Sequence, residues 1–147
     1  MMNNDNTITE QTLLYGYIGE NAMSSRFPAT VNKLFKNRSV NAMVIPMNIR
    51  PDDLVFTVSQ MRTSKLNGAI IATEYQEEVA NLLDEGSDAV KKEGYCDSIQ
   101  LRNGRLLGDV IATRSLQKYA EHPEITNDIA INALAYYFFE LITGEPL

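Results

Sequence analysis

Cysteine, histidine and tryptophan are almost absent from this chain of 147 residues, which has one cysteine, one histidine and no tryptophan. A single cysteine, Cys96, excludes an internal disulfide and is typical of a reducing cytoplasm, where we place the protein. Cys96 and His122 alone are too few for a zinc site, so no metal is expected. We expect Cys96 to be a small core residue and His122 to be an exposed connector residue before Pro123.

Long apolar runs and basic clusters are also missing. The longest apolar-rich segment, residues 129–142, is too short to span a bilayer, and residues 1–11 lack the apolar stretch of a signal peptide. The net charge is −6, and no more than two Lys or Arg residues are neighbours. Neither a membrane nor a nucleic acid is therefore an expected partner.

A glycine-rich phosphate loop is absent too, because the 8 glycines are scattered. Without such a loop, backbone N–H groups and a helix end do not combine to hold a pyrophosphate. No nucleotide or other cofactor is expected to bind this chain.

What is present is the pattern of an α/β domain. The length suits one core, predicted for residues 12–147 after a mobile polar tail, residues 1–11. Residues 13–18 form a buried strand pattern, a polar loop spans residues 19–26, and Pro28 opens a helix. Open α/β sheets place ligands where a strand ends in such a loop.

The remaining segments extend the same alternation. Strands are expected at residues 41–47, 69–72, 95–101 and 105–107, and helices from residue 50 and at 76–84, 87–92, 113–121 and 126–143. Asn103-Gly104 between two strand patterns predicts a type I′ hairpin. The expected fold class is a three-layer α/β/α domain with a mixed, mainly parallel sheet.

The last helix is apolar on both faces, so it is predicted to be buried on more than one side or to meet a second chain. Thr126 is expected to cap it, and Gly144 to end it. Its predicted core face comprises Ala130, Leu134, Tyr137, Phe138 and Leu141. The aromatic run at residues 136–139 is a candidate homodimer contact.

Four segments, in the same order, resemble parts of the substrate-binding domain of shikimate and quinate dehydrogenases. YGYIGENAMSSRFP, residues 15–28, resembles that family's Y-x-x-x-G-N-P-[VI]-x-H-S-x-S-P, with Gly19, Ser25 and Pro28 matching. GAIIATEYQ, from Gly68, is similar to G-x-N-V-T-x-P-x-K but keeps only the glycine. NGRLLGD, from Asn103, matches the family's hairpin, and FELITGEP, residues 139–146, is similar to its C-terminal F-E-L-W-T-G-x-x-P.

The resemblance implies a substrate domain without the family's NADP-binding Rossmann domain. In the family a lysine and an aspartate act on the substrate hydroxyl, and these positions fall on Gln76 and Ala112. Glutamine does not exchange a proton near neutral pH. No catalytic residue is therefore assigned, and the interpretation is a divergent, non-catalytic, stand-alone domain, a pseudoenzyme.

The resemblance also supplies candidate ligand-binding residues, namely Ser25, Gln76 and Asp97. Arg26, beside Ser25, is a candidate partner for the carboxylate of a small acid. Each of the first three has a structural alternative: Ser25 as a helix cap, Gln76 as a solvated first-turn residue, and Asp97 as a charge at the hairpin edge. Several of the family's polar positions fall on apolar residues, so a polyhydroxy acid such as shikimate is a poor candidate and a more apolar or smaller ligand is the alternative. These residues are Phe27, Ile70, Ala72 and Leu134.

Two other functions stay open. The chain could be the substrate half of a split NADP-dependent dehydrogenase that a separate cofactor-binding subunit completes. It could also be a structural or interaction protein that binds no small ligand, acting as a homodimer or with another protein.

Overall fold

The computed structural model describes residues 8–147, which divide into two compact units. We call them the sheet unit (residues 14–25 and 44–110) and the helical unit (residues 8–13, 26–43 and 111–147). The single domain expected for residues 12–147 stays a prediction. Of the expected mobile tail, residues 1–7 lie outside the described residues, and the backbone N–H of Thr9 donates to Thr12 Oγ1 at 2.9 Å.

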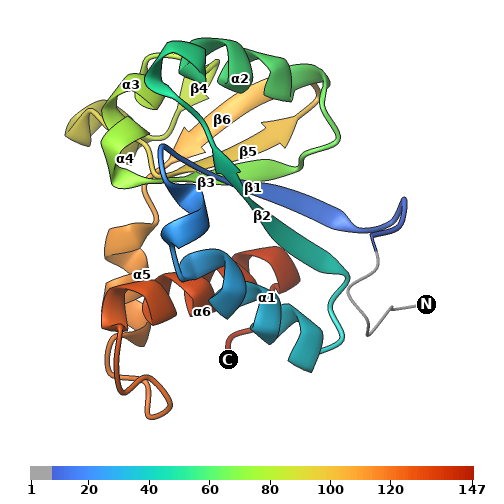
Figure 1. Cartoon of the computed structure of the whole chain (residues 1–147). Coiled ribbons are helices and arrows are strands. Elements are labelled where there is room, and N and C mark those ends of the chain that lie inside the picture. The colour runs from blue at the N-terminus through green and yellow to red at the C-terminus, as the bar shows by residue number, and fades with distance from the viewer. Residues whose placement is uncertain (1–7) are drawn as a thin grey trace. The chain divides into compact units, whose positions relative to one another are not determined.

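The sheet has six strands in the order β2-β1-β3-β5-β6-β4 (Figure 1). Their bounds are β1 Leu13–Gly19, β2 Ala42–Asn48, β3 Gly68–Ile71, β4 Glu85–Gly86, β5 Ser98–Arg102 and β6 Arg105–Asp109. The pairs β1–β3 and β4–β6 are parallel, whereas β3–β5 and β5–β6 are antiparallel. The predicted α/β class with a mixed sheet is thus confirmed. All four residues of β3 are buried, as its continuous apolar pattern indicated.

The hairpin between β5 and β6 has the predicted geometry. Arg102 pairs with Arg105 across a two-residue loop, and Asn103 and Gly104 have φ values of 52° and 73°. Positive φ at both central residues defines the type I′ turn. Strand β5 begins three residues later than predicted, because the Cys96 N–H donates to the Gln76 carbonyl at 3.0 Å instead of joining the ladder.

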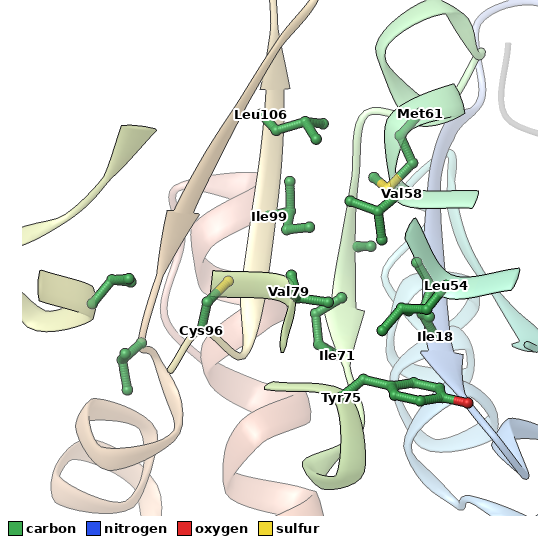
Figure 2. Close-up of a cluster of buried hydrophobic side chains, with 13 residues drawn as sticks. Ile18, Leu54, Val58, Met61, Ile71, Tyr75, Val79, Cys96, Ile99 and Leu106 are labelled. Atoms are coloured by element: carbon green, nitrogen blue, oxygen red, sulfur yellow. The ribbon is translucent and has the colours of Figure 1, made fainter. Parts of the chain in front are cut away.

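Helices α2 (Leu54–Gln60), α3 (Gln76–Ala80) and α4 (Asp88–Glu93) belong to the sheet unit, together with the short 3-10 turns η1 (Ala22–Ser24), η2 (Pro51–Asp53), η3 (Met61–Thr63) and η4 (Thr73–Tyr75). Figure 2 shows the cluster in which side chains of α2 and α3 meet those of β1, β3, β5 and β6. Its fully buried members include Ile18, Leu54 and Leu106.

Cys96 lies inside this cluster, which confirms its predicted role as a core residue. Its thiol donates to the Ser98 carbonyl at 3.2 Å. Burial raises the pKa of the thiol to about 12, so the reactive thiolate is suppressed.

Helix α3 is shorter than predicted, and β4 was not predicted at all. After Ala80 the chain turns, and the Asp84 N–H donates to the Leu106 carbonyl at 3.0 Å as in a sheet. The Asp84 carboxylate accepts from the Leu106 N–H at 2.7 Å and pairs with Arg62 Nε at 3.0 Å. The hydrogen bond from Arg62 lowers the pKa of Asp84. Tertiary contacts to Arg62 and Leu106 therefore end the helix that the apolar spacing predicted to continue.

The helical unit contains α1 (Phe27–Asn37), α5 (Ala112–Tyr119) and α6 (Ile129–Thr143). Pro28 stands in the first turn of α1, as predicted. Helix α6 packs on both α1 and α5. Aromatic rings join α1 to α6: Phe138 makes edge contacts with Phe27 and Phe35, and Phe139 stacks on Phe35 at 5.7 Å between centroids.

Two details of α6 differ from the prediction. The helix starts at Ile129, and its N-cap is Asp128, with φ 43°, instead of Thr126. The Asn132 side chain donates to the carbonyls of Asn127 and Asp128 at 2.8 and 3.3 Å, which holds this left-handed start. The C-terminal prediction is confirmed, because Gly144 ends the helix with φ 76°.

The predicted core face of α6 was mostly wrong. Ala130 and Leu141 are exposed, and Leu134 and Tyr137 are only half-buried. Both α1 and α5 pack on α6, so the buried residues come from more than one of its faces. They are Ala133, Ala135, Tyr136, Phe138 and Phe139.

His122 is half-buried rather than exposed, which corrects the sequence prediction. Its ring lies 5.1 Å from the ring of Tyr136 and 6.0 Å from that of Tyr119. Its Nδ1 accepts from the Glu124 N–H at 3.2 Å, so in the neutral ring Nε2 carries the proton and donates to the Leu147 carbonyl at 3.2 Å. His122 thus joins the loop before α6 to the C-terminal residues.

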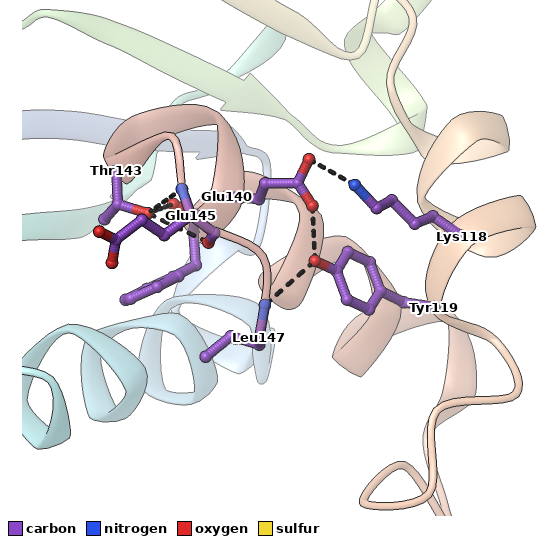
Figure 3. Close-up of polar contacts among 7 residues, drawn as sticks. Lys118, Tyr119, Glu140, Thr143, Glu145 and Leu147 are labelled. Carbon is purple, nitrogen blue, oxygen red and sulfur yellow. Dashed lines mark hydrogen bonds and ion pairs between the residues drawn. The ribbon is translucent and has the colours of Figure 1, made fainter.

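A polar network connects α5 to α6 and the residues beyond it (Figure 3). Glu140 accepts from Lys118 Nζ at 2.7 Å and from the Tyr119 hydroxyl at 2.6 Å. The same hydroxyl accepts from the Leu147 N–H at 3.3 Å. The hydrogen bonds from Lys118 and then Tyr119 lower the pKa of Glu140, while burial raises that of Tyr119 to about 12.

The lowered pKa of Glu140 predicts an acid-dependent loss of stability. A carboxyl whose pKa is lower in the folded than in the unfolded state stabilises the fold above its unfolded value. That contribution should disappear as the pH falls below the ordinary value of 4.5 and through the lower folded value. Urea unfolding across this range should show a smaller pH dependence for Glu140→Gln than for the parent. The exposed control Glu121→Gln should keep the parent profile, and an unchanged profile for Glu140→Gln would contradict the assignment.

Candidate functional site

Four strands bring their ends to one edge of the sheet in the sheet unit. Strands β1 and β3 run parallel and end at Gly19 and Ile71. Strand β5 is antiparallel to β3, so its first residue, Ser98, pairs with Ile70 at the same end. Strand β6 reverses again and brings Asp109 opposite Ser98. Ligands of open α/β sheets bind outside the carboxyl ends of the parallel strands, which is this edge.

Gln76 and Asp97 come together around Ile71 at this edge. The Gln76 side-chain Nε2 donates to the Ile71 carbonyl at 2.9 Å, and the Ile71 N–H donates to the Asp97 carbonyl at 2.9 Å. Gln76 is half-buried and begins α3, whereas Asp97 is only 3% exposed. Neither residue is therefore a fully solvated charge or amide, although their ligand role stays a prediction.

Asp109 holds the neighbouring strand end. Its Oδ1 accepts from the Ser87 hydroxyl and from the Val110 N–H, both at 2.8 Å. Its carbonyl accepts from the Asp97 N–H at 3.1 Å. Asp109 thus fixes the backbone on which Asp97 stands.

Ser25 lies in the loop of residues 20–25, which follows β1 in the same unit. Its N–H donates to the Ala22 carbonyl at 3.1 Å, which closes the η1 turn, and its side chain is half-buried. The residue at the cap of α1 is Arg26, and no side chain makes the capping hydrogen bond there. The N-cap position of α1 is thus Arg26 and not Ser25.

Arg26 is the first residue of the next segment of the helical unit, and its guanidinium pairs with Asp128. The prediction that it binds a ligand carboxylate stays a prediction, and such binding would compete with Asp128. Ala112, at the start of α5, and Leu134, in α6, also belong to the helical unit.

Carboxylates dominate the electrostatics around Tyr75, which follows β3. Its hydroxyl donates to the Ile49 carbonyl at 2.5 Å. Burial is the main cause of its raised pKa, and the negative charges of Glu20, Glu74, Glu78 and Asp53 raise it further. A phenol surrounded in this way stays protonated at neutral pH and acts as a hydrogen-bond donor.

The sequence did not identify Glu74 and Asn48 as residues of this edge. Glu74 Oε2 accepts from the Glu20 N–H at 2.8 Å, and Asn48 Oδ1 accepts from the Met23 N–H at 3.0 Å. The only sequence feature that pointed to Asn48 was its position directly after the predicted second strand. Glu74 corresponds to a proline in the family motif, so no sequence feature pointed to its carboxylate.

Across residues 8–147 no group of three or more His, Cys, Asp or Glu side chains is placed to hold a metal ion. No helix in the described part of the chain combines the length and apolarity needed to cross a bilayer.

Sequence comparison supports the motifs. The family model for the shikimate dehydrogenase substrate binding domain matches residues 17–99. The shikimate dehydrogenase (NADP(+)) of Alkaliphilus oremlandii is 34% identical over 101 residues, covering 69% of this chain and 35% of that protein. The Aquifex aeolicus enzyme of the same name is 30% identical over 101 residues, covering 69% and 38%. The chain thus spans little more than a third of the length of these relatives.

Solved structures show the same fold. The crystal structure of Aquifex aeolicus shikimate dehydrogenase aligns with a TM-score of 0.71 and 27% identity, covering 82% of this chain and 46% of that one. The 5-ketofructose reductase of Gluconobacter sp. strain CHM43 aligns with a TM-score of 0.70 at 14% identity, covering 86% and 50%. Proteins named for different substrates share this fold, so the fold alone does not identify a ligand.

Proposed function

The chain belongs to the shikimate dehydrogenase substrate-binding domain family, and from this premise we propose that it is a non-catalytic module that binds a small carboxylic acid. The site is the edge at which β1 and β3 end. One observation carries the proposal: the Gln76 side chain and the Asp97 backbone both bond to the backbone of Ile71 at this edge, and Ser25 lies in the loop that follows β1 in the same unit.

The chemistry of these groups suits binding rather than proton transfer. A carboxamide has two N–H donors and one carbonyl acceptor, and the Ile71 carbonyl uses one donor of Gln76. The remaining groups can hold a hydroxyl or carboxylate of a ligand. An amide neither gains nor loses a proton near neutral pH, so it cannot act as the general acid or base of a dehydrogenase.

The apolar residues at family ligand positions favour an acid with few hydroxyls. Ile70 and Ala72 are 1% and 8% exposed. A site built to bond hydroxyls loses affinity strongly when its polar partners are replaced. We therefore propose a cyclic monocarboxylic acid less hydroxylated than shikimate as the ligand class.

A titration followed by amide NMR tests this function. We expect saturable shifts at Ser25, Gln76 and Asp97 with cyclohexene-1-carboxylate, and weaker binding of shikimate and quinate. Gln76→Ala should weaken binding by about tenfold through the lost hydrogen bonds, whereas Gln60→Ala, an exposed glutamine on α2, should have no effect. Absence of shifts with all three acids at millimolar concentration would overturn the proposal and favour an interaction protein.

An activity assay separates the second candidate. The purified chain with shikimate and NADP should produce no NADPH, because Gln76 offers no proton-transfer group. Production of NADPH by the chain alone would overturn the non-catalytic assignment. Production only after a separate cofactor-binding subunit is added would support the split dehydrogenase.

The homodimer stays a proposal, and it needs a surface other than the aromatic run at residues 136–139. Tyr136, Phe138 and Phe139 are buried within the helical unit, so these side chains are not available to a second copy. Ile129 and Leu141 are large apolar residues of α6 that are exposed, at 47% and 50%.

A further inference from the structure

The loop of residues 20–25 is attached to the sheet unit by two side chains from distant segments. The Glu20 N–H donates to the carboxylate of Glu74, and the Met23 N–H donates to the amide oxygen of Asn48. We propose that Glu74 and Asn48 are positioning residues that hold this loop, and with it Ser25, at the edge of the sheet. An effect of these residues on ligand affinity rests on the proposed function. Their attachment of the loop does not depend on it.

The attachment to Glu74 depends on close packing at Gly19. A Cβ on Gly19 would lie 2.8 Å from the Cβ of Ala72 and 3.0 Å from Oε2 of Glu74. The absence of a side chain therefore lets the end of β1 approach the segment after β3. Because of this approach, the carboxylate reaches the first N–H of the loop.

Between its two attachments the loop is a formed turn. The Ser24 N–H and hydroxyl both contact the Asn21 carbonyl, at 3.2 and 2.9 Å, and the Ser25 N–H bonds to Ala22. Ala22 is 1% exposed, so the turn is anchored in the interior as well. A turn fixed at Glu20, Ala22 and Met23 leaves Ser25 little freedom of position.

In this chain residue 74 supplies a side-chain hydrogen-bond acceptor. The residue falls on a proline of the family motif, and a proline side chain has no hydrogen-bond acceptor. A carboxylate accepting a backbone N–H makes a charge-assisted bond, which is stronger than a neutral one. A loop already held in its binding geometry loses less freedom on binding, so affinity rises.

Amide hydrogen exchange on the full chain tests the attachment without any ligand. Glu74→Ala should speed exchange of the Glu20 amide by about fivefold, and Asn48→Ala should do the same for the Met23 amide. Glu74→Gln keeps a carbonyl acceptor and should restore the protection of Glu20. Glu77→Ala, an exposed carboxylate on α3, is the matched control and should leave both amides unchanged. Equal Glu20 exchange in the parent and Glu74→Ala, or no rescue by Glu74→Gln, would overturn the proposal.

A binding measurement then tests the consequence, with cyclohexene-1-carboxylate as the probe. Affinity should fall several-fold in Glu74→Ala and return in Glu74→Gln. Both variants lack the charge of Glu74, so a difference between them reports on the hydrogen bond and not on electrostatic repulsion. Equal affinity in the two variants would overturn the link to binding. No binding by the parent chain would instead refute the proposed function, while the exchange data would still decide how the loop is held.

Discussion

Replacing Gly68 with alanine should destabilise the protein by about 3 kcal/mol or more, because the new Cβ has no space. An added Cβ would lie 2.2 Å from the backbone oxygen of Ile99, 3.3 Å from its carbonyl carbon and 3.4 Å from the Cα of Gln100. All three atoms belong to the backbone of β5, which pairs with β3 through Gly68 and Gln100. Relief requires β5 to move away from β3, which breaks the hydrogen-bond ladder at the centre of the sheet.

Gly108→Ala is the matched comparison. Its Cβ would also meet an atom at 2.2 Å, but this atom is Cδ1 of Leu83, a flexible side chain, and the next contact is Cys96 Sγ at 3.0 Å. Overpacking against side chains typically costs about 1–3 kcal/mol. For Gly68→Ala, the free energy of unfolding, measured with urea, should therefore be well below that of Gly108→Ala. A loss for Gly68→Ala that is equal to or smaller than that for Gly108→Ala would contradict the backbone clash. Failure of Gly68→Ala alone to fold would agree with it.

Replacing Phe35 with alanine should cost about 3–5 kcal/mol, which is usual for a buried phenylalanine. Phe35 is 1% exposed and contacts the rings of both Phe138 and Phe139, with centroids 6.4 and 5.7 Å away. Its removal leaves a cavity between α1 and α6 and deletes both aromatic contacts. The free energy of unfolding, measured with urea, should fall by this amount.

Phe56→Ala on α2 removes the same side chain from a site that is 68% exposed. Its effect should stay within about 0.5 kcal/mol, as for most surface substitutions. If the two variants lost similar stability, the packing of α1 against α6 would not be the source of the loss at Phe35.

Local chemistry explains which parts of the fold could be predicted. The Asn103-Gly104 turn, Pro28 in the first turn of α1 and Gly144 at the end of α6 follow from backbone preferences of single residues, and the structure has all three. The failures have tertiary causes. Asp84 left the predicted helix because Arg62 and Leu106 bind it.

The residues of the candidate site also divide into those that the sequence pointed to and those that depend on tertiary contacts. Family motifs pointed to Gln76 and Asp97, which lie beside the ends of β3 and β5, and to Ser25, in the loop after β1. The topology puts these ends of β1, β3 and β5 at one edge of the sheet, while the ligand role of the three residues stays a prediction. No local pattern indicated that the carboxylate of Glu74 would reach Glu20, 54 residues earlier in the chain. Contacts of that kind depend on the completed sheet and on the missing side chain of Gly19, so a single sequence does not reveal them.

The division into two units has a consequence for the order of events during synthesis. The chain passes from one unit to the other at residues 13/14, 25/26, 43/44 and 110/111, so neither unit is a continuous stretch. Helix α1 leaves the ribosome about a hundred residues before its partner α6, with Phe27 and Phe35 still uncovered. Contacts so distant in sequence close large loops and form slowly. Until α6 emerges, the nascent chain therefore carries α1 with its apolar face uncovered.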